Sequence, residues 1–307
     1  MKISTFNVNG INGRLPVLLR WLAETEPDVV CLQEIKATQE NRNSPGGLRR
    51  CLARAEELEL LARDAYPIET RRGLPGDPND DESRYVEAAV DGVLLGCLYM
   101  PNGNPAPGPK FDYKLRWFER LTAHAAELLE TAAPVLLAGD FNVMPTDLDV
   151  YKPERWVDDA LFRPEVRAGF HRLLAQGWTD ALRSLHPSDR IYTFWDYFRN
   201  TWTRDAGLRI DHLLLSPSIK GRLIRAGVDR EVRGWEKASD HAPAWIELAE
   251  GREKPTSRAL PRSRAPEMLR AEPFEASELP ASGDHGGMTS STRRSRILRS
   301  QASEFST

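Results

Sequence analysis

Short apolar segments recur along the first 250 residues, separated by polar turns and by longer amphipathic stretches. Apolar runs between turn-forming residues are typical of buried strands, whereas apolar residues spaced three or four apart predict helices. Helices are predicted at residues 15–24, 113–130 and 164–176. The predicted strands are at residues 3–8, 29–33, 87–90, 93–99, 135–138, 210–215, 228–232 and 244–248.

The order of these elements bounds the fold. Some predicted strands follow one another directly, and others are separated by helices. This mixture favours an α+β fold with packed sheets and helices outside them, rather than a strict alternation of strand and helix. A chain of 307 residues, 40% of them hydrophobic, is large enough to bury such a core in one large domain or two small ones.

The composition changes sharply near Glu250. The residues that follow are rich in Pro, Ser, Arg and Glu, so they cannot bury enough surface to offset the entropy lost on ordering. We therefore predict a folded domain at residues 1–249 and a disordered polar tail at residues 250–307. The arginines of the tail could touch a phosphate backbone, but a solvated tail is the simpler expectation.

The net charge of −3 combines a body and a tail of opposite sign. Residues 251–307 hold ten Lys and Arg against seven Asp and Glu, which leaves the rest of the chain at −6. A basic body, the usual sign of non-specific nucleic-acid binding, is absent. Any nucleic-acid site must therefore be a local patch, or must use metal ions to offset acidic side chains.

Signals for a membrane or for export are missing from the sequence. No apolar run approaches the ~18 residues of a membrane span, and the N-terminus turns polar too soon for a signal peptide. The three cysteines are widely spaced and form no C-x-x-C pair, which indicates a reducing compartment and buried thiols. We expect a cytoplasmic monomer without membrane contacts.

Polar residues cluster where the predicted strands end. In residues 134–146, PVLLA is typical of a buried strand, and GDFN then places Asp140 and Asn142 directly behind it. Asp and Asn are turn formers, which would explain each such strand end singly. The convergence of several such ends on one edge of the core instead indicates a site. The other members are Asn7, Glu34, Tyr99, Asp211, Asp240 and His241.

Metal-assisted phosphodiester hydrolysis needs this set of side chains. Mg²⁺ prefers oxygen ligands and takes only one or two carboxylates, with water and substrate phosphate completing its shell. The remaining acidic and amide groups can hold a water in line, and a His paired with an Asp can face the developing charge. The absence of H-E-x-x-H and C-x-x-C motifs argues against zinc, and the absence of a P-loop argues against an NTPase.

The chain resembles the exonuclease III-like AP endonucleases of the endonuclease/exonuclease/phosphatase superfamily. The motifs FNVNG, LQE, GDFNVMPTDLDV, LRIDHLLLS and SDHAPAW occur here in the order found in that family. RGLPGD at 72–77 and FWDY at 194–197 are similar to the same branch, and the resemblance covers about residues 1–36 and 60–249. It implies a four-layered α/β sandwich, with two packed mixed β-sheets flanked by helices.

The resemblance also implies roles for the strand-end residues. Glu34 is expected to be the principal ligand of Mg²⁺, or of Mn²⁺ in its place, helped by Asn7 and Asp240. Asp140 is expected to position or deprotonate the attacking water, or to protonate the leaving oxygen. Asn142 is expected to orient the same groups by hydrogen bonds.

His241, held by Asp211, is expected to contact the scissile phosphate, and Tyr99 to donate toward it. Asp140, Asn142 and His241 are also candidate metal ligands. Taken singly, His241 and Tyr99 would be explained better by structural roles, and Asp211 equally well. The joint order of the motifs is what argues for a catalytic site.

Double-stranded DNA with abasic sites or 3′ ends is the partner that the resemblance implies. Phe194 and Trp195 lie in a motif similar to the family's pocket for a baseless sugar. Such a pocket would accept an extruded abasic residue and reject a normal nucleotide by shape. Either ring could instead fill the core. Lys110 and Arg72 are candidate phosphate contacts, and each could equally be a solvated surface charge.

The implied activity is metal-dependent hydrolysis 5′ to abasic sites, with 3′-to-5′ exonuclease activity on double-stranded DNA. A phosphatase or sphingomyelinase acting on a non-nucleic phosphoester is the alternative. The motif around Trp195 and the lack of a membrane-binding apolar patch disfavour it.

Residues 37–60 depart from the family pattern. The stretch NRNSPGGLRRCLARAEELEL at 41–60 predicts a Pro-Gly break and then an Arg/Glu/Leu helix, where the family has strands. We therefore expect one strand and most of a second to be missing from one sheet, with the neighbouring strand left as an exposed edge. Such a loss leaves open a third hypothesis, a folding-compromised, inactive relative that binds DNA weakly or not at all.

Overall fold

The computed structural model describes residues 1–36, 49–52 and 57–251, and only the backbone at 49–52. The chain divides into two units, Met1–Glu253 and Lys254–Thr307, and all the described elements lie in the first. From residue 252 onward, the predicted polar tail lies outside the described residues.

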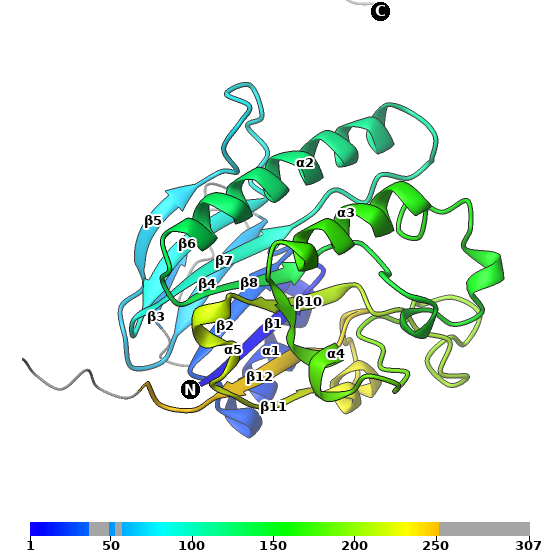
Figure 1. Cartoon of the computed structure of the whole chain (residues 1–307). Coiled ribbons are helices and arrows are strands. Elements are labelled where there is room, and N and C mark those ends of the chain that lie inside the picture. The colour runs from blue at the N-terminus through cyan, green and yellow to red at the C-terminus, as the bar shows by residue number, and fades with distance from the viewer. Residues whose placement is uncertain (37–48, 53–56, 252–307) are drawn as a thin grey trace, which may run out of the picture. The chain divides into compact units, whose positions relative to one another are not determined.

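The described strands form two six-stranded mixed sheets (Figure 1). The first sheet has the order β11-β12-β1-β2-β4-β3. Its strands β1 and β2 are parallel, and the other neighbours are antiparallel. The strands are β1 (Lys2–Asn7), β2 (Val29–Gln33), β3 (Arg49–Leu52), β4 (Leu58–Ala62), β11 (Leu223–Val228) and β12 (Ala244–Leu248).

The second sheet has the order β5-β6-β7-β8-β10-β9. Here β7 and β8 are parallel, and the other neighbours are antiparallel. Each sheet therefore places one parallel pair near its centre, so the carboxyl ends of those two strands lie at the same edge. The strands are β5 (Ile68–Arg72), β6 (Tyr85–Val90), β7 (Val93–Tyr99), β8 (Val135–Asp140), β9 (Thr179–Asp180) and β10 (Asp211–Leu215).

Alternating side chains bury both faces of the central strands. On β8, Leu136 and Ala138 pack in the cluster between the two sheets, whereas Val135 and Leu137 pack under helices. The helices over that outer face are α2 (Pro109–Glu130) and α3 (Pro164–Ala175), and Figure 1 shows them side by side above the second sheet. This period of two is the signal of a strand that is covered on both sides.

Helix α1 (Ile11–Thr25) covers the outer face of the first sheet. Its Leu18 and Trp21 pack in one cluster with Phe6 and Val30. The layers are thus α1, two sheets, and α2 with α3, which confirms the predicted α+β, four-layered α/β sandwich. The remaining helices are short: α4 (Ala181–Leu185), α5 (Pro217–Lys220), and the 3₁₀ helices η3 (Asp147–Asp149), η4 (Pro153–Arg155) and η5 (Arg230–Gly234).

The strand predicted at residues 228–232 is wrong. The chain forms β11 earlier, at Leu223–Val228, and then enters η5. Because β11 lies at the edge of its sheet, it exposes one face, and Ile224 and Arg225 obscure its apolar pattern. Val232, which completed the predicted strand, is instead buried in the cluster under α1.

The helix predicted within residues 41–60 is also wrong wherever the structure describes this segment. Residues 49–52 form β3, and residues 58–62 form β4, which pairs with both β2 and β3. The first sheet therefore has strands where we expected them to be missing. The composition of this segment favours a helix, but helix propensity is a weak determinant beside packing. Leu58 and Leu60 alternate around Glu59, and both are buried against the other sheet. Residues 37–48 and 53–56 lie outside the described residues.

Two further features bear on the expected compartment. Cys31 and Cys97 are buried free thiols, as predicted, and the side chain of Cys51 lies outside the described residues. Among the described helices, none is long and apolar enough to cross a membrane.

Candidate active site

The polar strand ends meet at one edge of the two sheets. Strands β1, β2, β7 and β8 end at this edge, and β10 begins there. In the first sheet Asn7 lies beside Gln33, the residue before Glu34. In the second sheet Asp140 lies between Tyr99 and Asp211. The backbone register thus brings together residues that are far apart in sequence.

Gly139 has a structural role at the end of the apolar strand β8, just before Asp140. A Cβ atom at residue 139 would lie only 1.9 Å from the Leu98 carbonyl oxygen of β7. Only glycine permits this approach of the two strands. The close pairing then presents Asp140, the next residue, at the edge of the sheet.

The Asn7 side chain bridges the two sheets. Its Nδ2 donates to Glu34 Oε1 and to Asp140 Oδ2, in both cases at 3.0 Å. Lys36 forms an ion pair with the second Glu34 oxygen, and the Tyr99 hydroxyl also hydrogen-bonds to Glu34. Burial opposes ionisation of Glu34, but the hydrogen bonds from Asn7, Lys36 and Tyr99 outweigh it and lower the pKa of this carboxyl.

Asp140, Asp211 and His241 form a buried acid–base group. His241 Nδ1 donates to Asp211 Oδ2 at 2.9 Å, and its Nε2 lies 3.8 Å from Asp140 Oδ2. Burial and the neighbouring Asp211 carboxylate raise the pKa of Asp140 to about 7. Burial would lower the pKa of His241, but the Asp211 carboxylate outweighs this and raises it to about 10. At neutral pH the group therefore pairs an imidazolium with a carboxyl that can gain or lose a proton.

Asn142 lies in a strained turn directly after β8. Its φ of 48° is left-handed, and its backbone N–H donates to Asp140 Oδ1 at 2.8 Å. The side chain donates from Nδ2 to Met100 O at 2.9 Å and accepts from Asn102 Nδ2 at 3.3 Å. Asn142 thereby joins Asp140 to the loop that follows β7.

The loop before β12 completes the cluster. Ser239 donates from Oγ to Asn7 O at 2.7 Å, which fixes this loop against β1. Asp240 accepts from Asn9 Nδ2 at 3.0 Å, and His241 follows with its backbone N–H on Ser239 Oγ. Asp240 is therefore held beside the FNVNG turn, although no hydrogen bond joins it to Glu34.

These residues fit a divalent cation. Ligand atoms of Asp140, Asp211 and His241 lie within 4.8 Å of one another. Asp211 Oδ1 is buried and has no hydrogen-bond partner among the described residues, which is costly for an acceptor unless something else binds it. Glu34 already attracts one cation, the Lys36 ammonium. The set consists mostly of carboxylate and amide oxygens, the ligands that suit Mg²⁺ and Mn²⁺.

Comparison with known proteins agrees with this geometry. Residues 4–241 match the endonuclease/exonuclease/phosphatase family. The chain belongs to this family. Over 81% of its length it is 31% identical to the whole of exodeoxyribonuclease III from Haemophilus influenzae. It is 30% identical to the DNA repair nuclease APEX1 from Danio rerio, again over 81% of the chain and over 82% of that protein. Within the family it is therefore an exonuclease III-like member and a hydrolase by type.

Solved structures give the same placement. The 3′-5′ exonuclease NExo from Neisseria meningitidis is 36% identical, with a TM-score of 0.78 over 81% of this chain and all of that chain. An AP endonuclease from Archaeoglobus fulgidus is 31% identical, with a TM-score of 0.77 over 81% of this chain and 99% of that chain. A further NExo structure, described as a 3′ phosphatase, contains a product DNA hairpin.

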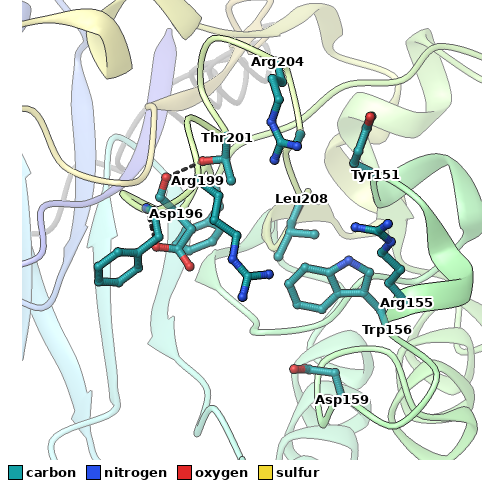
Figure 2. Close-up of a pocket in the computed structure, with 12 residues that line it drawn as sticks. Tyr151, Arg155, Trp156, Asp159, Asp196, Arg199, Thr201, Arg204 and Leu208 are labelled. Atoms are coloured by element: carbon teal, nitrogen blue, oxygen red, sulfur yellow. Dashed lines mark hydrogen bonds between the residues drawn. The ribbon is translucent and has the colours of Figure 1, made fainter.

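In this protein, a cavity of about 520 Å³ adjoins the acidic cluster formed by the strand-end residues. Phe194 joins the two regions, because its ring lines the cavity and packs 5.0 Å from the His241 ring. Figure 2 shows the opposite walls, with Trp156 and Arg155 on one side and Arg199 on the other. The walls come from residues 151–159, around η4, and from residues 194–208, before β10.

Three arginines that line this cavity differ from most of the other arginines that the structure describes. Arg155, Arg199 and Arg204 form no side-chain hydrogen bond, ion pair or cation–π contact with any described residue. The two acidic residues of the cavity wall are already engaged. Asp159 accepts from Asn104 and from Leu161 N, and Asp196 accepts from Phe198 N. The cavity thus offers positive charge that has no partner among the described residues, beside the acidic cluster.

The predicted DNA contacts fall in different places. Trp195 does not line this cavity: its side chain is 1% exposed, packs with Tyr192, and donates to Asp205. Lys110 is exposed in the first turn of α2. Arg72 lies on the edge strand β5 and pairs with Glu69. Of the predicted pocket residues, only Phe194 faces the cavity.

Several residues of the site were not singled out from the sequence. Asn9 and Ser239 lie inside the motifs FNVNG and SDHAPAW, so their position beside Asn7 and Asp240 could have indicated them. Lys36 lies two positions after the Glu34 of LQE. The cavity arginines, by contrast, lie outside every quoted motif, and only the folded chain reveals them.

Proposed function

We propose that this protein is a DNA repair nuclease that hydrolyses phosphodiesters 5′ to abasic sites and removes nucleotides from 3′ ends of double-stranded DNA, with Mg²⁺ or Mn²⁺. The observation that carries the proposal is the junction of two regions through Phe194. On one side lies a carboxylate–imidazole cluster that can hold a metal, and on the other a cavity with unpaired guanidiniums. A metal ion and positive side chains would together stabilise the negative charge of a bound phosphodiester. The cavity would give an extruded sugar a place to bind.

Glu34, with Asn7 and Asp240 near it, and the carboxylates of Asp140 and Asp211 would hold the metal. A bound divalent cation would supply Lewis-acid stabilisation of negative charge on the phosphate oxygens. The geometry supports this assignment because Asn7 links Glu34 to Asp140 through one amide. Loss of Asn7 would release both carboxylates at once.

Asp140 and His241 would handle the proton and the charge. A carboxyl with a pKa of about 7 can accept a proton from an attacking water or donate one to the leaving oxygen. The His241 imidazolium, held by Asp211, would face the anionic phosphate from Nε2. Tyr99 stays protonated, since burial and the Glu34 carboxylate raise its pKa, so its hydroxyl is a donor. Asn142 would orient Asp140 through its backbone N–H.

The cavity would hold the residue next to the scissile bond. Phe194 and Leu208 give it an apolar floor, and Arg155 and Arg199 can bind flanking phosphates. Lys110 and Arg72 remain candidate contacts to the DNA backbone farther out. Similarity to NExo, which is described as a 3′-5′ exonuclease and as a 3′ phosphatase, supports an activity at 3′ ends of DNA. Similarity to the AP endonuclease and to the DNA repair nuclease APEX1 supports cleavage at abasic sites.

The test uses the full chain and end-labelled duplexes. One duplex carries a single stable abasic-site analogue, and a second carries a recessed 3′ end. We expect Mg²⁺-dependent cleavage on the 5′ side of the abasic site, stepwise shortening of the 3′ end, and loss of both with chelator. Cleavage of a small non-nucleic phosphoester but of neither duplex would instead favour the phosphatase alternative and overturn the proposal.

A further inference from the structure

Lys114 lies beneath the active-site loops, in the second turn of α2. Its side chain is completely buried, which is rare for lysine. The side-chain nitrogen Nζ donates to Asn142 O at 2.5 Å and to Asn102 O at 3.0 Å. These two carbonyls belong to different loops, one after β8 and the other after β7. One lysine side chain therefore joins the two loops that border the edge where the acidic cluster lies.

Glycine at residue 103 makes room for this contact. The φ of Gly103 is 88°, and a Cβ there would lie 2.7 Å from Lys114 Cδ and 3.3 Å from Lys114 Cβ. The loop after β7 thus passes directly over the lysine stem. Gly103 has a backbone conformation that favours glycine. This conformation brings the loop close enough for the buried Lys114 amine to reach the hydrogen-bond partner that it needs.

The two loops also meet above the lysine through their side chains. Asn102 Nδ2 donates to Asn142 Oδ1, and Asn102 Oδ1 in turn accepts from Asn104, whose Nδ2 reaches Asp159 in the cavity wall. A line of amides therefore runs from the catalytic cluster to the cavity. Its two members closest to Asp140, Asn102 and Asn142, are the residues whose carbonyls bind Lys114.

We infer that Lys114 is a positioning residue for the reaction: it fixes the Asn102–Asn142 amide pair, and through Asn142 the Asp140 carboxyl, without touching DNA or metal. This inference rests on the proposed nuclease function. It predicts an effect on turnover rather than on substrate binding, because misplacing a catalytic group by about 1 Å can cost ~10²-fold in rate.

The first test replaces Lys114 by methionine, which keeps an unbranched stem of similar length but removes the donor. Arg116→Met is the matched control, since Arg116 is an exposed cation on the same helix. We expect Lys114→Met to lower kcat on the abasic duplex by about 10- to 100-fold and to change KM by less than about 2-fold. Arg116→Met should leave both unchanged. Wild-type kcat in Lys114→Met, or a loss confined to KM, overturns the inference.

Lys114→Gln keeps one neutral donor and tests the same idea if the methionine variant folds poorly. Its kcat should fall between those of Lys114→Met and the wild type. The double variant with Asn102→Ala gives a readout that general destabilisation would not move. If Lys114 acts through Asn102 and Asn142, the combined loss must be smaller than the product of the single losses. Fully multiplicative losses contradict the inference.

Hydrogen exchange separates this inference from the nuclease proposal, because it needs no substrate. In Lys114→Met, amides of residues 100, 102–104 and 141–143 should exchange at least ~10-fold faster than in the wild type, whereas those of β1 should not change. Unchanged exchange in both loops would overturn the positioning role even if the wild type is an active nuclease. Faster exchange in a protein without nuclease activity would instead sink only the nuclease proposal.

Discussion

The acidic cluster and the cavity beside it differ in whether their polar and charged side chains have partners within the protein. In the cluster, Asn7, Glu34 and His241 are each held by partners within the protein. In the cavity, Arg155 and Arg199 have no such partner among the described residues. A cluster held internally keeps its geometry before substrate arrives, which suits catalysis. Guanidiniums without partners suit recognition of an anion that comes from outside. We therefore expect substitutions in the cluster to change turnover and substitutions in the cavity to change binding.

The largest effect is expected for Glu34. Glu34→Ala removes the carboxylate that three neighbouring groups hold ionised, and should lower metal-dependent cleavage by ~10³-fold or more. The melting temperature of the metal-free protein should change little. Glu119→Ala, on the exposed surface of α2, is the control. Cleavage at the wild-type rate by Glu34→Ala would remove the metal assignment.

His241 and Asp211 come next. Each alanine variant should slow turnover by ~10²-fold or more, the scale of a positioned acid–base group. Because the two residues are joined by one 2.9 Å hydrogen bond, the loss in the double variant should be well short of multiplicative. The measurement is a double-mutant cycle on kcat. Independent, multiplicative losses would mean that the pair does not work as a unit.

The cavity variants should behave differently from these. Arg199→Ala and Arg155→Ala should raise KM by several-fold with little change in kcat, and each should reduce the salt dependence of duplex binding by about one unit of slope. Arg116→Ala is the matched control, an exposed arginine of α2 that does not line the cavity. If kcat falls and binding does not, the proposed division between the two regions fails.

The smallest effect concerns stability against pH in the metal-free protein. Folding raises the pKa of His241 from 6.5 to about 10, so the folded state holds a proton that the unfolded chain releases. This stabilisation is complete below pH ~6.5 and is lost as the pH rises toward ~10. Melting temperatures of His241→Gln should therefore depend less on pH within this window. An identical pH dependence in the variant and the wild type would contradict the paired imidazolium.

The cluster could be predicted from the sequence, because its residues follow strands whose apolar pattern is strong. Strands β2 and β8 are buried on both faces, so the strands predicted at 29–33 and 135–138 placed Glu34 and Asp140 just beyond strand ends. Parallel pairing of β2 with β1 and of β8 with β7 then brings each of these ends beside the end of its neighbour. The element at 58–62 could not be predicted in the same way. Its Glu and Leu composition favours a helix, and only packing against the second sheet makes it a strand.

The cavity could not be predicted, because loops rather than regular elements form it. Arg155 and Arg199 are 44 positions apart, and no periodic pattern links residues 151–159 to residues 194–208. FWDY did indicate Phe194, but not that Trp195, one residue later, packs away from this cavity, against Tyr192. Neighbouring residues in an extended segment face opposite sides, so only one of the two could reach the cavity.

Binding and cleavage by Asp140→Asn test the role of the strand-end cluster most directly. The substitution keeps the shape of the side chain but removes the carboxyl whose pKa lies at about 7. With Mg²⁺ and an abasic-site duplex, we expect wild-type affinity within about 3-fold and single-turnover cleavage slower by at least ~10²-fold. Cleavage within about tenfold of the wild-type rate at equal affinity would contradict the claim that this cluster performs the hydrolysis.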